Sequence, residues 1–132
     1  MLPFLFDDSG LPGSPALVAE VLAGITTKEA LFAELAQRLQ FPDYFGANWD
    51  ALWECIRDLS WLPPGPVVLR HHDLPLAGDV VSLKKYLSIL RDTVEKRWSR
   101  SRARDLIVVF PPETRDQVVW LLRSAGYDEE RH

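Results

Sequence analysis

The residues of this chain that could do chemistry gather in the segment 42–59, where carboxylates recur at helical spacing. Asp50, Glu54 and Asp58 are each four residues apart, so on an α-helix of 3.6 residues per turn they form one stripe. Like charges at this spacing oppose the helix by about 0.2–0.5 kcal/mol per pair. Part of this cost is offset if Arg57 pairs with Glu54. The stripe is therefore either a solvated helix face or a surface that binds a cationic partner.

Aromatic side chains are interleaved with these carboxylates. Tyr44, Phe45, Trp49 and Trp53 fall within the same short stretch, and Trp and Tyr are enriched at protein interfaces. All four could instead pack in the core. Helical phase places Trp49 on the side opposite the stripe. We therefore expect Trp49 and Phe45 in the core and Tyr44 and Trp53 closer to the surface.

Other kinds of chemistry have little support in the sequence. Asp50 and Glu54 could act as the paired carboxylates of an acid–base enzyme, but no Gly-rich phosphate loop or Cys/His metal spacing accompanies them. Residues 71–73 read His-His-Asp, and neighbours on a strand point to opposite faces, which favours a solvated strand end over a metal site. Cys55 is expected to be a buried or half-buried thiol. We predict no enzyme activity, no metal and no cofactor.

One basic run, residues 96–104, offers an alternative function. It could contact RNA with Trp98 stacking on a base, although cationic residues also favour a helix C-terminus for structural reasons. The formal net charge of −4 argues against a general nucleic-acid binder. An RNA-binding regulator that uses this basic run is therefore the weaker of the functional hypotheses.

The length and composition indicate what kind of scaffold positions these residues. The 132 residues, 47% apolar and 26% charged, are typical of one globular domain, here 1–132. A single cysteine excludes an intrachain disulfide and favours a reducing compartment. The first eight residues lack the features of a signal peptide, and no apolar stretch approaches the roughly 20 residues that span a bilayer. We expect a cytoplasmic protein that is not in a membrane.

Apolar runs predict the strands. The run at 16–23 fits a buried strand or part of a helix, and Gly24 behind it favours the strand. Residues 67–71 also read as a strand, and the unbroken apolar run at 106–110 predicts a third strand that is covered on both sides. Residues 1–8 could add another.

Helices are predicted between and after these strands. Thr26 and Glu29 fit a capping box at the start of the first, and Asn48 is a good N-cap for the second. The predicted helices run from Thr26 or Thr27 to Pro42, from Asn48 to 59 or 60, over about 79–97, and over about 113–124. Strands that alternate with helices predict an α/β layered fold with a small, mostly parallel sheet.

The segment Pro42–Cys55 reads P-D-Y-F-G-A-N-W-D-A-L-W-E-C and closely resembles the motif of the barstar family, roughly P-E-Y-Y-G-x-N-x-D-A-L-W-D-C. The order of predicted elements also fits that family from about residue 16 to residue 110. The resemblance implies a barstar-like layered fold, in which a three-stranded sheet packs with helices. The N-terminal stretch and the last helix would be additions to this core.

The resemblance also implies a function. Barstar-like proteins are intracellular inhibitors that bind a ribonuclease and block its cationic active site with the acidic face of this helix and the loop before it. Carried over by motif, Tyr44 would pack against the catalytic pocket of the enzyme. Asp50 and Glu54 would face its Arg and Lys groups, and Trp53 would flank them.

The remaining positions follow from the same resemblance. Gly46 and Asn48 would shape the loop and cap the helix, and Asp92, on the later helix, would supply a further acidic contact. Glu54 stands where the family usually has Asp, and Phe45 replaces a common second Tyr. Glu54 and the added C-terminal helix leave open an alternative, a bacterial immunity or binding module of the same fold for a different toxin or regulatory protein.

Overall fold

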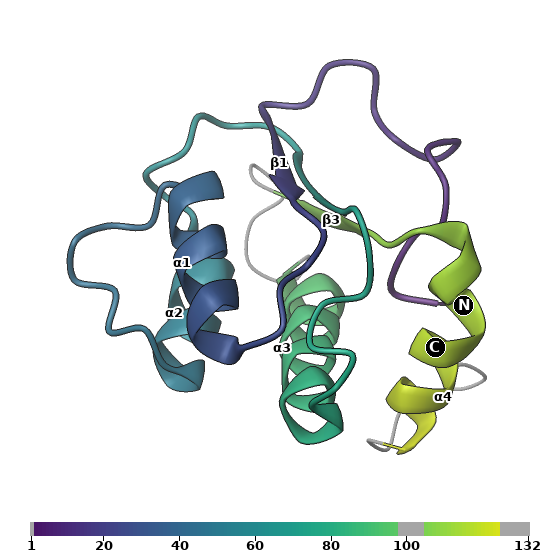
Figure 1. The fold of residues 1–132 in the computed structure, drawn as a ribbon. Coiled ribbons are helices and arrows are strands. Elements are labelled where there is room, and N and C mark those ends of the chain that lie inside the picture. Colours follow the sequence, from purple (N-terminus) through teal and green to yellow (C-terminus); the bar gives the residue numbers. More distant parts are fainter. Residues whose placement is uncertain (1, 98–104, 125–132) are drawn as a thin grey trace.

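Strands alternate with helices along the described part of the chain. The structure is a computed structural model and describes residues 2–97 and 105–124. Its elements, in chain order, are β1 (Leu17–Val21), α1 (Lys28–Arg38), α2 (Trp49–Asp58), β2 (Val67–His71), α3 (Val80–Arg97), β3 (Leu106–Val109), a 3-10 turn (Pro112–Thr114) and α4 (Arg115–Ser124). Figure 1 shows the arrangement of these elements.

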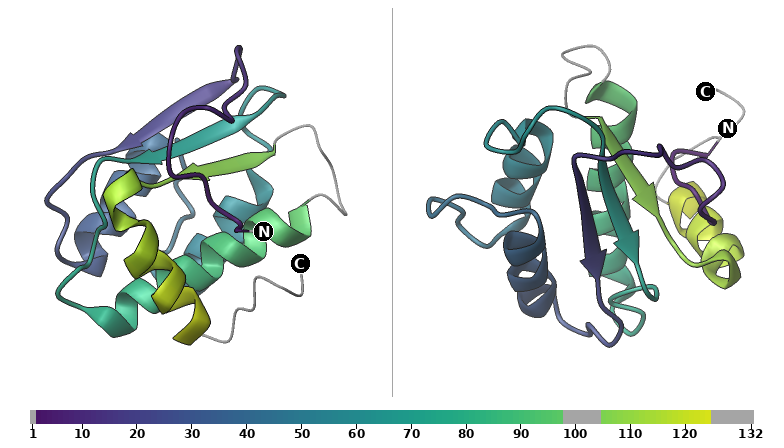
Figure 2. Two further views of the ribbon diagram at one scale, coloured as in Figure 1. Left: turned by 90° about the vertical axis from the view of Figure 1, so that its right-hand side faces the viewer. Right: turned by 90° about the horizontal axis from the view of Figure 1, so that it is seen from above.

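The three strands form one parallel sheet in the order β1-β2-β3. In its register Leu69 of the central strand lies opposite Ala19 and Val108. Helices α1, α2 and α3 lie on the same side of this sheet (Figure 2). The predicted α/β class and small parallel sheet are confirmed, and pairing with β2 settles residues 17–21 as strand.

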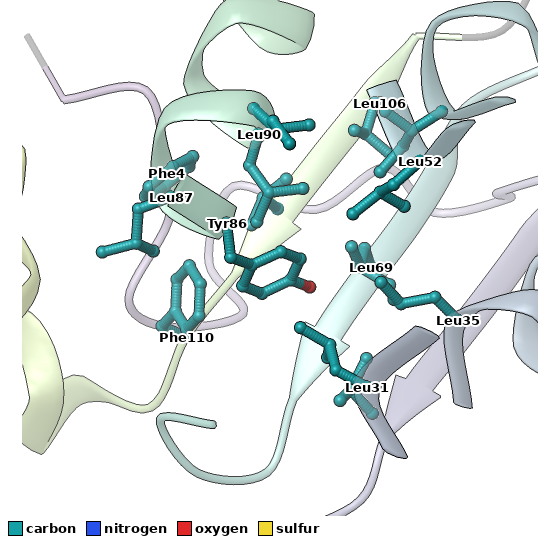
Figure 3. Close-up of a cluster of buried hydrophobic side chains, with 14 of the residues drawn as sticks. Phe4, Leu31, Leu35, Leu52, Leu69, Tyr86, Leu87, Leu90, Leu106 and Phe110 are labelled. Carbon is teal, nitrogen blue, oxygen red and sulfur yellow. The ribbon is translucent and has the colours of Figure 1, made fainter. Parts of the chain in front are cut away.

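The core lies between the sheet and the helices. Residues at alternate strand positions face the helices, as the period of two requires, and they meet the apolar stripes of α1, α2 and α3. Figure 3 shows this cluster, which includes Leu31, Leu35, Leu52, Leu69, Tyr86, Leu87, Leu90, Leu106 and Phe110.

Among its described residues, the N-terminal stretch joins the sheet at one bridge. Leu5 forms an isolated parallel bridge with Val109. Its N–H donates to the carbonyl of Val108, and its own carbonyl accepts from Phe110 N–H, both at 2.9 Å. Phe4 is buried and packs edge-on against Phe110 at 5.3 Å between ring centroids. The possible strand at 1–8 is thus reduced to one bridge at the β3 edge.

The last helix packs beside α3 through Val118, Leu121 and Leu122, which are all buried. Its predicted span is confirmed, with the first turn wound as the 3-10 turn that follows Pro111. No helix in the described residues is both long enough and apolar enough to cross a bilayer.

Two local predictions were wrong. The cap of α1 is Thr27, whose Oγ1 accepts from Ala30 N–H at 3.1 Å, so Thr26 and Glu29 do not occupy the two ends of a capping box. His71 is not a solvated strand end: only 2% of it is exposed. Its neighbour His72 is exposed and bonds Glu20 at 2.7 Å, as expected from the alternation of a strand.

His71 links three elements. Its Nδ1 lies 2.9 Å from the carbonyl of Val109, its Nε2 lies 2.6 Å from the hydroxyl of Tyr86, and its ring stacks on Phe110 at 4.0 Å. Burial lowers the pKa of His71 to about 4 and raises that of Tyr86. The ring is therefore neutral, with Nδ1–H donating to the carbonyl and Nε2 accepting from the hydroxyl.

Candidate protein-binding face

The loop that precedes α2 is anchored by aromatic rings. Phe45 packs against Phe41 and Phe32, with ring centroids at 4.9 and 6.3 Å, and Trp49 packs edge-on against Phe32 at 4.9 Å. Trp61 contacts Phe41 and donates its indole N–H to the carbonyl of Leu39 at 2.9 Å. Phe45 and Trp49 pack against the core cluster but are only half-buried, so the expectation that they lie in the core is met in part. These contacts hold the loop 40–48 in place beneath its exposed side chains.

The turn into α2 is tight. Asn48 caps the helix: its Oδ1 accepts from Ala51 N–H at 2.8 Å, and its Nδ2 donates to the carbonyl of Gly46 at 3.4 Å. A Cβ at Gly46 would come within 3.3 Å of this Nδ2. Ala47 has a φ of 51°, in the left-handed region that L-residues other than Asn and Asp seldom occupy. The structure thus places Asn48 as the cap of α2, and Gly46 lies in the loop before it, where its role in shaping the loop stays a prediction.

Helix α2 divides into a buried and an acidic face. Leu52, Cys55 and Ile56 are buried, and Leu59 follows as a buried C-cap with a φ of 52°. The opposite face carries the acidic stripe, which we define as Asp50, Glu54 and Asp58; all three are exposed. The predicted separation of core and acidic faces is therefore present.

Two aromatic side chains border the acidic stripe. Tyr44, in the loop, is 73% exposed. Trp53 is half-buried and packs against the core cluster with part of its ring. The expectation that these two lie closer to the surface than the core is correct for Tyr44 and only partly so for Trp53.

A cation lies among the carboxylates. The Arg57 guanidinium carbon is 3.9 Å from the ring centroid of Trp53, and its Nη1 is 3.9 Å from Oε1 of Glu54. The sequence predicted the ion pair with Glu54 but not the stacking on Trp53. The signal for it was available, because residues 53 and 57 are four apart and i, i+4 side chains are neighbours on a helix.

Asp92 lies on α3, which packs beside α2. It is half-exposed, and Arg91 Nη2 lies 3.4 Å from its Oδ1. Asp92 thus belongs to the neighbouring helix, with a cation beside it, rather than to the acidic stripe itself.

Cys55 is a free, buried thiol on α2. Burial raises its pKa, and the negative charges of Asp58 and Glu54 raise it further. Since the thiolate is the nucleophile, this environment lowers the reactivity of Cys55. The described residues contain no group of three His, Cys, Asp or Glu side chains that could hold a metal ion. The side chains of the basic run 96–104 lie outside the described residues.

Comparison with known proteins agrees with this geometry. A protein named "Putative ribonuclease inhibitor YrdF", from Bacillus subtilis (strain 168), is 49% identical over 35 residues. That match covers 26% of this chain and 38% of the relative. The family model described as Barstar (barnase inhibitor) matches residues 17–111, well over half of the chain. The chain, with its parallel sheet and its capped acidic helix, therefore belongs to the barstar family.

Proposed function

We propose that this protein inhibits a ribonuclease inside the cell that makes it, by inserting the acidic stripe and Tyr44 into the active site of the enzyme. The single observation that carries the proposal is the exposed set of carboxylates on α2, a helix whose start is fixed by the Asn48 cap and the packed loop before it. In this role the protein is a binding partner and not itself a catalyst.

Phosphate chemistry explains why carboxylates fit such a site. An enzyme that cleaves RNA must bind a phosphodiester, and Arg and Lys do this through charge-assisted hydrogen bonds. Carboxylates of Asp50 and Glu54 can accept the same hydrogen bonds in place of the phosphate oxygens. Opposite charges on the two proteins also accelerate their encounter, in a way that weakens with salt.

The anchored loop contributes rigidity. Because Phe45 and Trp49 are held by Phe32, Tyr44 is presented from a loop that loses little freedom on binding. Preorganisation of this kind raises affinity by lowering the entropic cost of association. Asp92 is proposed as a peripheral contact from α3, where Arg91 would compete for its carboxylate.

Glu54 bears on which enzyme is bound. The side chain is one methylene longer than the family's usual Asp, so its carboxylate reaches further from the helix axis. The exposed position and the long 3.9 Å contact with Arg57 leave it able to turn toward a cation on the partner. We propose that the partner has its cation set further from the helix than an Asp would require.

Direct binding tests the proposal. The protein is titrated into barnase, and into a panel of small secreted bacterial ribonucleases, by calorimetry at rising salt concentration and with inorganic phosphate as competitor. We expect a 1:1 complex with at least one enzyme, weakened by salt and displaced by phosphate. If the protein binds none of them, or if binding to its partner is indifferent to both salt and phosphate, the proposal is wrong.

A second candidate, a binding module for a different toxin or regulatory protein, draws support from α4. This helix lies beyond the matched residues 17–111 and carries the exposed Trp120. Recovery of a nuclease when the tagged protein is isolated from its native cell favours inhibition of a ribonuclease. Recovery of a single non-nuclease partner favours the second candidate.

A further inference from the structure

The loop 40–48 begins with a sharp reversal of the chain at the end of α1. Gln40, which follows the Leu39 cap, has a φ of 57°. The N–H of Phe41 then donates to the carbonyl of Ala36 at 2.9 Å. This is the reversal of a Schellman motif, in which a left-handed residue turns the chain away from the helix. Because Gln40 has a Cβ, this conformation is strained and persists only where surrounding contacts hold it.

Tyr44 lies at the tip of a second turn in the same loop. The N–H of Phe45 donates to the carbonyl of Pro42 at 3.0 Å, so residues 42–45 form a β-turn with Tyr44 as its third residue. The residues that bracket this turn are Phe41 and Phe45, whose ring centroids lie 4.9 Å apart. Since the Tyr44 side chain is exposed, its direction depends on how these two rings are held.

Trp61 holds the first of these rings from beyond the far end of α2. It lies in a turn that follows the helix, where Leu62 N–H donates to the carbonyl of Leu59 at 3.0 Å. Its half-buried ring meets Phe41 at 6.0 Å between centroids, and its indole N–H donates to the carbonyl of Leu39 at 2.9 Å. Leu39 is fully buried, so its carbonyl would lose this donor where water does not easily replace it.

We propose that Trp61 is a positioning residue, which holds the turn of Tyr44 in the direction that suits the pocket of an enzyme. This inference rests on the proposed function and deepens it. Trp61 holds the end of α1 through Leu39 and the start of the loop through Phe41. Phe41 packs against Phe45, and these two rings bracket the turn that carries Tyr44. Trp61 therefore acts on the partner through Tyr44.

The acidic stripe is held by different contacts. The start of α2 is fixed by Asn48, whose Oδ1 accepts from Ala51 N–H at 2.8 Å, and the buried face of the helix packs in the core. Loss of the hydrogen bond from Trp61 should therefore disturb Tyr44 and leave Asp50 in place. A direct contact between Trp61 and the partner, or a general loss of structure, would not distinguish these two residues.

The order of the turn in the free protein gives a first test. Trp61→Phe removes the indole N–H and keeps an aromatic ring, and circular dichroism confirms that the variant is folded. Amide relaxation measured by NMR reports motion of the backbone on the picosecond to nanosecond timescale. We expect the order parameter of the Phe45 amide to fall in the variant, while that of Ala51, held by the Asn48 cap, stays as in the wild type. Unchanged order at Phe45 would contradict the positioning role.

A double-mutant cycle tests whether Trp61 acts through Tyr44. The affinity for the ribonuclease that the wild type binds most tightly is measured by calorimetry with and without Trp61→Phe, in the wild type, in Tyr44→Ala and in Asp50→Asn. Residues that act as one unit give effects that do not add, whereas independent residues give effects that do. Trp120→Phe is the matched control, because Trp120 belongs to α4, on the other side of α3 from α2 (Figures 1 and 2).

We expect Trp61→Phe to raise the Kd about fivefold in the wild type and in Asp50→Asn, the change to which the loss of one hydrogen bond corresponds. With Tyr44→Ala present the rise should stay below about twofold, because the contact that Trp61 positions is already gone. Trp120→Phe should leave the Kd unchanged.

Two results overturn the inference while the proposed function stands. One is a rise in Kd of less than about twofold for Trp61→Phe in the wild type. The other is a rise as large in Tyr44→Ala, or for Trp120→Phe, as for Trp61→Phe in the wild type. If the wild type binds no ribonuclease, the proposed function fails and takes this inference with it.

Discussion

The buried His71 makes stability depend on pH in a way that the structure specifies. Its folded pKa is about 4, against an ordinary value of 6.5, because burial penalises the imidazolium. Between these two values the unfolded chain binds a proton on this ring and the folded chain does not. Stability contributed by the neutral ring is therefore fully present above pH 6.5 and is lost as the pH falls toward 4.

The magnitude follows from the two pKa values. Each unit of difference corresponds to about 1.4 kcal/mol, so the whole effect of a pKa near 4 is about 3 kcal/mol. About 2 kcal/mol of this is lost between pH 7 and pH 5. That window lies above the range in which most carboxylates titrate, so His71 can be isolated there.

The assay compares the wild type with His71→Gln by urea denaturation at pH 7, 6 and 5. Glutamine also offers an amide donor and a carbonyl acceptor but does not titrate. His72 and His132 are present in both proteins, so their contributions cancel in the difference. We expect the stability advantage of the wild type over the variant to shrink by about 2 kcal/mol from pH 7 to pH 5. An advantage that stays constant over this range would refute the buried neutral histidine.

Two further predictions concern α2. Asn48→Ala removes the cap on Ala51 N–H and should lower the free energy of unfolding by about 1 kcal/mol, while Asn48→Asp should keep most of it. Equal urea midpoints for wild type and Asn48→Ala would contradict the cap. The buried thiol of Cys55, whose pKa is raised by burial and by the adjacent carboxylates, should react with a disulfide reagent at pH 8 at least a hundredfold more slowly in the native protein than in urea. Comparable rates would show that the thiol is accessible.

The sequence predicts α2 well because its signals are local. Asn48 marks the start of the helix. The apolar positions at 52 and 56 and the carboxylates at 50, 54 and 58 recur with the period of an α-helix. Nothing outside the segment is needed to separate its two faces. The motif at 42–55 also predicts the protein family, and the barstar family model, which matches residues 17–111, confirms that prediction.

What the sequence missed depends on distant residues. The burial of His71 requires Tyr86 on α3 and Val109 on β3, and neither is signalled near position 71. The strand at 17–21 was ambiguous until its pairing with β2 was seen. Leu5 pairs with Val109 of β3, and no local sequence pattern indicates contact between residues so far apart in the chain. The site residues remain predictions, because contact with a partner is not a property of this chain alone.

Inhibition of RNA cleavage tests most directly whether the acidic stripe is the blocking surface. The bound ribonuclease is assayed with wild type, with Asp50→Asn plus Glu54→Gln, and with Glu113→Gln plus Asp116→Asn, a control of equal charge change at the start of α4. Each charge-assisted hydrogen bond contributes roughly 1.5–3 kcal/mol, so two of them should raise the inhibition constant by about a hundredfold or more. We expect that loss for the α2 variant and full inhibition by the control. Equal inhibition by the α2 variant and the wild type would contradict it.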